Sequence, residues 1–153
     1  MSPRSRTNQL LYQAELLVGL PVGDDEHAPV RQMAIEESAL ALFELALGSL
    51  LKEVTEHARL NSHDWRELLA SDGPDVAELQ RLRDAMQQPE SWLYWLVGQL
   101  EKLHSDDGAA RRAVQNPSMI AVGSQLTLAE QLLENLQAAK RDIASLRETS
   151  QEW

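Results

Sequence analysis

The stretch PVRQMAIEESALALFELALGSLLKEVTEHARL, residues 29–60, decides the fold. Its apolar residues recur at the spacing of an α-helix and form two stripes. The first stripe comprises Met33, Leu40, Phe43, Leu47, Leu50, Val54 and Ala58, and the second comprises Ile35, Ala39, Leu42 and Ala46. A helix with two apolar faces is typical of the centre of a bundle, and Pro29 suits its first turn because an N–H there would have no partner. We predict one central helix, roughly 45 Å long at the α-helical rise.

The same periodicity predicts helices on both sides of this stretch, and no segment has a convincing strand pattern. We expect helices at 7–18, at 75–88, at 89–104 and at 127–148. A short helix with Ser62 as its N-cap and Asp64 in its first turn is expected to carry Trp65, Leu68 and Leu69. Thr127 and Glu130 have the spacing of a capping box. The last helix is expected to bury Leu133, Leu136, Ala139, Ile143 and Leu146. The predicted fold is therefore all-α, an antiparallel helical bundle of four long helices plus one or two short accessory helices.

Length, composition and charge exclude several classes of protein. The chain has 153 residues, 43% of them apolar and 25% charged, which is ordinary for one globular domain spanning 1–153. It has no cysteine, so disulfides and thiolate zinc sites are excluded. The formal net charge of −10 opposes nonspecific binding to nucleic acid or to an anionic membrane surface. No stretch approaches the ~20 apolar residues of a membrane span, and no cleavable leader pattern is present, so we expect a cytoplasmic protein.

The only clusters of basic residues are three pairs. They are Arg4 with Arg6, Arg111 with Arg112, and Lys140 with Arg141. None of the pairs is interleaved with aromatic residues as in a base-stacking platform. We interpret them as solvated surface and expect no nucleic-acid partner.

Three short motifs carry a resemblance to a known family. They are Arg6-Thr7-Asn8-Gln9-x-x-Tyr12, Asn116-Pro117-x-x-Ile120-Ala121-Val122 and Arg147-Glu148-x-x-Gln151-Glu152-Trp153. Together they resemble an uncharacterised gammaproteobacterial family of small, wholly helical proteins. The resemblance covers the whole chain and implies a helical fold. It implies no activity, catalytic residue or cofactor, because the family has none assigned.

One pattern of residues is compatible with a metal site. Glu101 and His104 have the Glu-x-x-His spacing that supplies half of a ferritin-like di-metal site, but the nearest counterpart, Glu53 with His57, is spaced one residue wider. Further acids on the central helix are Glu36, Glu37 and Glu44. These acids fall mostly between the two apolar stripes, where solvated side chains belong. We therefore predict no metal site and no cofactor.

Patterns for other chemistry are weak or absent. Arg59 and His63 have three intervening residues and straddle the predicted helix end, so they miss the spacing used by helical-bundle ribonucleases and nucleotide-handling proteins. The chain has no nucleophile elbow, no phosphate-binding glycine loop and no His-Glu-x-x-His motif. We predict no catalytic residues.

The aromatic residues of the 89–104 helix are the candidate interface. Trp92, Tyr94 and Trp95 lie within four consecutive positions. On a helix Trp92 and Trp95 point in similar directions and Tyr94 points away. We therefore expect that the core does not bury all three rings. Core packing is one interpretation. An anchor for a partner is the other, because Trp and Tyr dominate interface hot spots.

These observations predict a noncatalytic cytoplasmic bundle that acts through protein contacts, as a homodimer or a small adaptor. The alternative is an enzyme or ligand-binding bundle with a metal or nucleotide site between helices. Buried carboxylates or histidines would favour the alternative, whereas a dry core with exposed apolar surface would favour protein contacts. A nucleic-acid mimic would need its acids in a regular row, which their dispersed positions do not provide.

Overall fold

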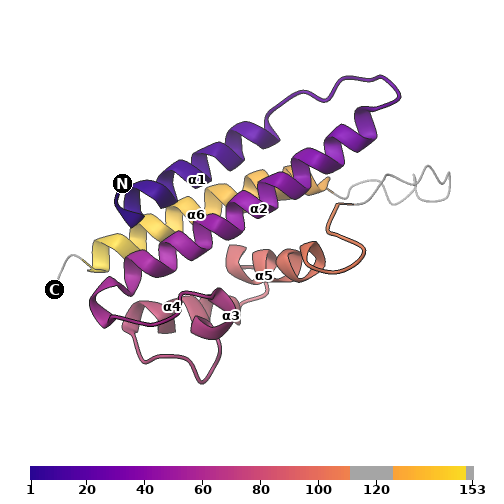
Figure 1. Cartoon of the computed structure of the whole chain (residues 1–153). Coiled ribbons are helices and arrows are strands. Elements are labelled where there is room, and N and C mark those ends of the chain that lie inside the picture. The colour runs from indigo at the N-terminus through magenta and orange to yellow at the C-terminus, as the bar shows by residue number, and fades with distance from the viewer. Residues whose placement is uncertain (111–125, 151–153) are drawn as a thin grey trace.

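The structure is a computed structural model that describes residues 1–110 and 126–150. Its elements are α1 (Pro3–Val18), α2 (Ala28–Val54), a 3₁₀ turn η1 (Glu56–Ala58), α3 (Trp65–Leu68), α4 (Ala77–Met86), α5 (Trp92–Leu103) and α6 (Leu128–Ser150) (Figure 1). No β-strand occurs within the described ranges, which confirms the all-α class. The predicted residues Arg111 and Arg112 and the motif at 116–122 lie outside these ranges.

Three helices, α1, α2 and α6, form one side of the molecule (Figure 1). α2 and α6 run in the same direction, because Glu36 contacts Ala129 near one end and Glu53 contacts Arg147 near the other. α1 runs antiparallel to both (Figure 1). The central position expected for the 29–60 stretch is confirmed for α2. Among the described residues, α2 contacts each of the other α-helices, namely α1, α3, α4, α5 and α6.

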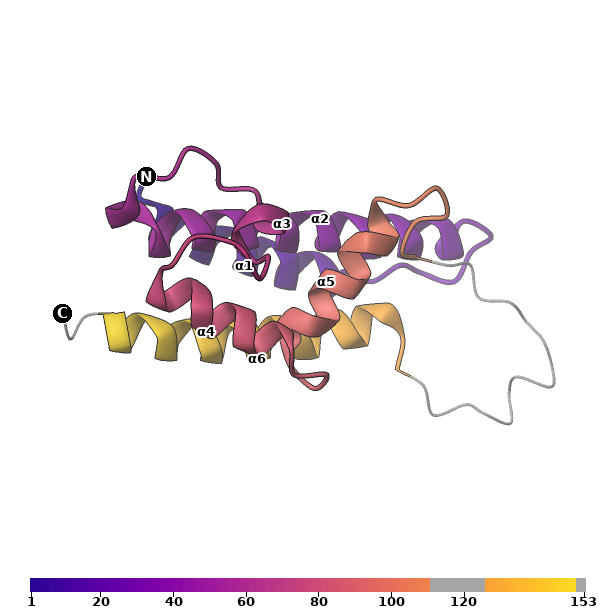
Figure 2. The ribbon, with the colours of Figure 1, turned by 90° about the horizontal axis from the view of Figure 1, so that it is seen from below.

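The helices α3, α4 and α5 form the opposite side (Figure 2). α4 and α5 run against the direction of α6, because Arg81 bonds Thr149 late in α6 and Trp95 bonds Gln131 early in it. α5 is inclined to the long helices, and it has 12 residues against 16, 27 and 23 for α1, α2 and α6 (Figure 2). The predicted arrangement of four long antiparallel helices is therefore only partly found.

Helix ends follow local hydrogen bonds that differ in places from the predictions. α1 begins at Pro3 because the Ser2 hydroxyl accepts from the N–H of Ser5 at 3.1 Å. Asp64, not Ser62, caps α3 by accepting from the N–H of Arg66 at 3.0 Å. These short polar side chains satisfy N–H groups that a helix start leaves free.

The central helix ends earlier than predicted. α2 stops at Val54, and Arg59 takes a left-handed φ of 49° after the 3₁₀ turn. The expected helix to Leu60 was wrong here because a left-handed residue cannot continue a right-handed helix. By contrast, the cap on α6 is confirmed, since the hydroxyl of Thr127 accepts from the N–H of Glu130 at 3.1 Å.

Leucine and alanine side chains from every α-helix fill the core. Both predicted stripes of α2 face it: residues such as Ala39, Phe43 and Leu50 are buried, and Leu42 is half-buried. On α6, Leu132 is fully buried and Leu133 is 40% exposed, so the predicted inward position of Leu133 was wrong. Adjacent residues on a helix point about 100° apart, and in α6 it is Leu132 that faces the other helices.

Candidate functional site

Two surfaces and one groove are the candidates for function, and the aromatic helix α5 comes first. Trp92 is 3% exposed and stacks on Phe43, with ring centroids 5.9 Å apart and planes 9° apart. Its indole Nε1 donates to Asp142 at 2.9 Å. Trp95 is half-buried and donates to Gln131 at 3.0 Å. Buried indoles with satisfied N–H groups act as core residues.

Tyr94 is the member of the predicted interface that reaches the surface. It is 51% exposed, and the Ser91 hydroxyl caps the helix by accepting from its backbone N–H at 3.0 Å. The structure therefore separates the three predicted residues: two indoles hold α5 to α2 and α6, and one phenol is left to solvent.

A second apolar surface lies on α1, which the sequence analysis did not single out. Tyr12 and Leu16, four residues apart on α1, are 58% and 54% exposed, and Leu20, which follows the C-cap residue Gly19 and lies outside the helix, is 53% exposed. We call these three residues the α1 row. Helical periodicity alone does not identify these exposed residues, because the buried face of α1 has apolar residues at equally regular spacing. Exposed Leu or Tyr residues are ordinary singly, whereas three that follow one another along a helix and its end form an apolar patch.

The carboxylates predicted as possible metal ligands have structural partners instead. Glu44 accepts from His104 Nε2 and from Trp65 Nε1, each at 2.9 Å, and it thereby ties α2 to α3 and to the end of α5. Glu101 is exposed. Within residues 1–110 and 126–150, no group of three or more His, Asp or Glu side chains is arranged to hold a metal ion.

Glu53 and His57, the wider-spaced pair, do not act together. The carboxylate of Glu53 forms a two-point ion pair with Arg147, at 2.6 and 3.0 Å, and Arg147 also bonds Asn8. Both ionic side chains are about 15% exposed or less. His57 is exposed on the 3₁₀ turn. This part of the pattern therefore links α1, α2 and α6 rather than forming a reactive site.

The structure corrects the prediction that Glu36 and Glu37 are solvated. Glu36 is 5% exposed and accepts from the N–H of Ala129 at 2.9 Å, which caps α6 from another helix. Glu37 accepts from the N–H of Ala110 at 3.4 Å. A signal for Glu36 existed in the sequence, since it precedes Leu40 by four residues and so continues the first apolar stripe.

The remaining predicted pair lies in the loop after η1. Arg59 is exposed and His63 is half-buried. No functional geometry follows from these positions.

No helix in the described part of the chain is both long and apolar enough to cross a bilayer.

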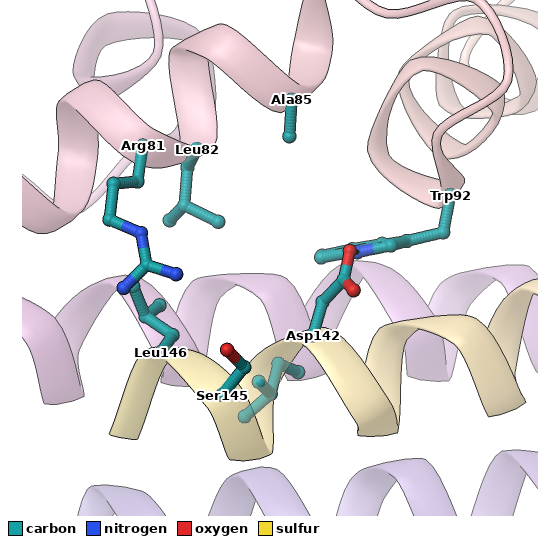
Figure 3. Close-up of a pocket in the computed structure, with 8 residues that line it drawn as sticks. Arg81, Leu82, Ala85, Trp92, Asp142, Ser145 and Leu146 are labelled. Atoms are coloured by element: carbon teal, nitrogen blue, oxygen red, sulfur yellow. Dashed lines mark hydrogen bonds between the residues drawn. The ribbon is translucent and has the colours of Figure 1, made fainter. Parts of the chain in front are cut away.

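A groove between α4 and α6 is a candidate site for a small molecule. Its volume is about 210 Å³, and its polar lining comes from Arg81, Asp142 and Ser145 (Figure 3). Leu82, Trp92 and Leu146 contribute apolar surface. The sequence analysis named none of the polar residues, because they come from two helices about 60 residues apart.

One ionisable group outside these surfaces has a shifted pKa. The guanidinium of Arg31 bonds Asp25 at 2.5 Å, the N–H of His27 donates to the same carboxylate at 2.9 Å, and together they hold the pKa of Asp25 below 3.8. Asp25 is exposed in the loop between α1 and α2. The same guanidinium of Arg31 also donates to the carbonyl of Val22 at 2.8 Å. The hydrogen bonds that lower the pKa of Asp25 therefore hold the loop between α1 and α2 in place.

Comparison with known proteins gives a family and no further relative. A family model, described as a family of unknown function (DUF6586), matches residues 1–153. No curated protein and no solved structure matches the chain. The expectation from the three short motifs, a family of helical proteins without an assigned activity, is thereby confirmed.

Proposed function

We propose that the chain, which belongs over its whole length to a family of unknown function (DUF6586), is a noncatalytic cytoplasmic protein that acts through protein contacts. The observation that carries this proposal is the α1 row of exposed Tyr12, Leu16 and Leu20. The contact is a homodimer in the first instance, with a small adaptor role as the other form of the same proposal.

The interior supports a noncatalytic role. Within residues 1–110 and 126–150, the buried polar or charged residues are Thr7, Glu36, Ser49, Thr55 and Arg83. Each has a hydrogen-bond partner that stabilises the fold, such as the carbonyl of Leu51 for the hydroxyl of Thr55. A catalytic carboxylate or base needs a free lone pair or proton facing substrate, whereas these five side chains lie within the helix packing, each less than 10% exposed.

The geometry of the α1 row suits a symmetric contact. In an antiparallel pair of α1 helices centred on Leu16, Leu16 meets its own copy, and Tyr12 faces the segment just after the end of the partner helix, where Leu20 lies. Such an isologous contact uses one surface twice. Flanking residues must extend it to the ~1,000 Å² that a stable interface needs.

Sedimentation equilibrium of three proteins tests this proposal. The wild type is expected to be a dimer at micromolar concentration, and Leu16→Glu a monomer, because the substitution places two carboxylates face to face at the axis. Leu45→Glu is the matched control, since Leu45 is 55% exposed on α2 and receives the same charge. A wild type that stays monomeric to high concentration contradicts the homodimer. A dimer lost in Leu45→Glu and kept in Leu16→Glu moves the contact to α2.

Tyr94 provides the second arm of the same experiment. Tyr94→Ser removes the exposed ring of α5 without touching the core, because both neighbouring indoles keep their hydrogen bonds. We expect this variant to remain dimeric. A monomeric Tyr94→Ser protein would assign the interface to α5, as first predicted from the sequence.

A further inference from the structure

We propose that the groove between α4 and α6 binds a small aliphatic zwitterion of dipeptide size, with its carboxylate at Arg81 and its ammonium at Asp142. The groove holds about 210 Å³ and is lined on both helices (Figure 3). This inference is independent of the α1 row, which lies on another helix.

Arg81 supplies the anion-binding end. Its side chain crosses from α4 to α6, where Nη1 donates to the hydroxyl of Thr149. This bond holds the guanidinium beside α6, with a terminal nitrogen directed toward the groove (Figure 3). A guanidinium has five N–H donors in a fixed plane, so the hydrogen bond to Thr149 leaves donors for a carboxylate.

Asp142 supplies the cation-binding end. Its Oδ2 accepts from the indole Nε1 of Trp92 at 2.9 Å, which fixes the orientation of the carboxylate. Among the described residues no hydrogen bond reaches its Oδ1. An ionised carboxylate accepts several hydrogen bonds, and an ammonium group offers three donors. Asp142 can therefore hold an ammonium while keeping its contact with Trp92.

The spacing of the two ends sets the length of the ligand. Thr149, which marks the position of the guanidinium, follows Asp142 by seven residues, or about 10 Å along the helix. A hydrogen bond of about 2.9 Å at each end leaves at least ~5 Å between the two charges of the ligand. A single α-amino acid, with two bonds between its charged groups, is too short. One more peptide unit adds up to ~3.8 Å and satisfies the distance.

The groove surface between the ends selects an aliphatic body. Leu82, Ile143 and Leu146 line it, and the hydroxyl of Ser145 lies on α6 between the two charged residues. An aliphatic side chain of the ligand would cover these residues, while the hydroxyl can bond its peptide group. Glycyl-leucine has each of these features and is the probe of choice.

Titration of the full-length protein by nuclear magnetic resonance tests the site. The probe is glycyl-leucine, and the signal is the indole N–H of Trp92, which shifts when Asp142 takes a second partner. A ligand of this size in an open groove is expected to have a Kd on the order of 1 mM. Leucine, N-acetylglycyl-leucine and glycyl-leucinamide, which lack the length, the ammonium or the carboxylate, should bind at least about tenfold more weakly.

Charge-matched variants locate the binding. Arg81→Gln and Asp142→Asn should each weaken binding about tenfold, and Asn keeps an oxygen for the indole of Trp92. Arg141→Gln and Glu134→Gln make the same changes of charge at exposed positions of α6 and should leave the Kd unchanged. The proposal is overturned if glycyl-leucine, at about ten times the expected Kd, causes no shift of the Trp92 signal. It is also overturned if the four probes bind alike, or if the two groove variants behave as their controls.

Discussion

The two sides of the molecule are held together in different ways. On the side of α1, α2 and α6, long helices pack through leucine and alanine, and a small polar cluster joins them at one end. There Glu53 pairs with Arg147, and Thr7 donates to Ser49 at 2.9 Å. On the side of α3, α4 and α5, short helices depend on side chains that bond backbone or cross to another helix.

Arg83 shows the second mode most clearly. It is 8% exposed on α4, and its guanidinium donates to the carbonyl of Leu68 at 2.8 Å and to that of Pro74 at 2.7 Å. Gly73 permits this approach, because a Cβ there would lie 2.6 Å from Nη2 of Arg83. A loop without a regular ladder needs such donors for its buried carbonyls.

The difference teaches that helix length substitutes for specific polar contacts. A helix of four or more turns buries a long apolar stripe and satisfies most of its own backbone groups. A helix as short as α3, with four residues, satisfies few, so side chains from elsewhere complete it. The two sides should therefore respond differently to substitution.

The largest effect is expected where the two sides meet. Trp92→Ala removes the stack on Phe43 and the bond to Asp142, and it leaves a cavity between α5 and α2. We expect the free energy of unfolding to fall by about 4 kcal/mol, measured by urea denaturation. Trp92→Phe, which keeps a ring and loses the N–H, should cost far less. A loss below about 1 kcal/mol in Trp92→Ala would mean that the two sides do not depend on this contact.

A smaller and more local effect is expected on the short-helix side. Arg83→Met keeps much of the volume and leaves the buried carbonyl of Leu68 without a donor, while that of Pro74 keeps the N–H of Val76, so we expect a loss of about 2 kcal/mol. Hydrogen exchange should increase at residues 65–76 more than in α1 or α6. Glu53→Gln is the opposite case, since it should increase exchange where α1, α2 and α6 meet and leave α3 unaffected. Uniform increases in both variants would contradict the contrast between the two sides.

The smallest effect is expected in the α1–α2 loop. Arg31 lowers the pKa of Asp25 in the folded protein, so this carboxylate stabilises the loop above pH 3.8 and loses that contribution as the pH falls through its folded pKa. Arg31→Gln should raise the pKa of Asp25 toward 3.8, followed by carboxyl carbon shifts. An unchanged pKa of Asp25 in the variant would mean that the bond to Arg31 is not kept in solution.

Local patterns account for the parts that were predicted well. The two stripes of α2 and the cap at Thr127 depend on residues within a few positions of one another, so periodicity and hydrogen-bonding type suffice. The same reasoning placed Ser62 instead of Asp64 as the cap of α3, because adjacent polar residues compete for one role and only the backbone angles choose between them.

What the sequence by itself determined is the helical class, the central place of α2 and the absence of thiol chemistry, since composition and periodicity act through each residue's own preferences. Only the tertiary structure decided that Glu36 caps α6, that Arg83 holds the loop before α4, and that Arg81 and Asp142 share one groove. It also decided that the indole of Trp92 is inside and the ring of Tyr94 outside. The physical reason is that these contacts join residues 9 to 93 positions apart, or depend on which face a neighbouring helix covers, and no local preference specifies either.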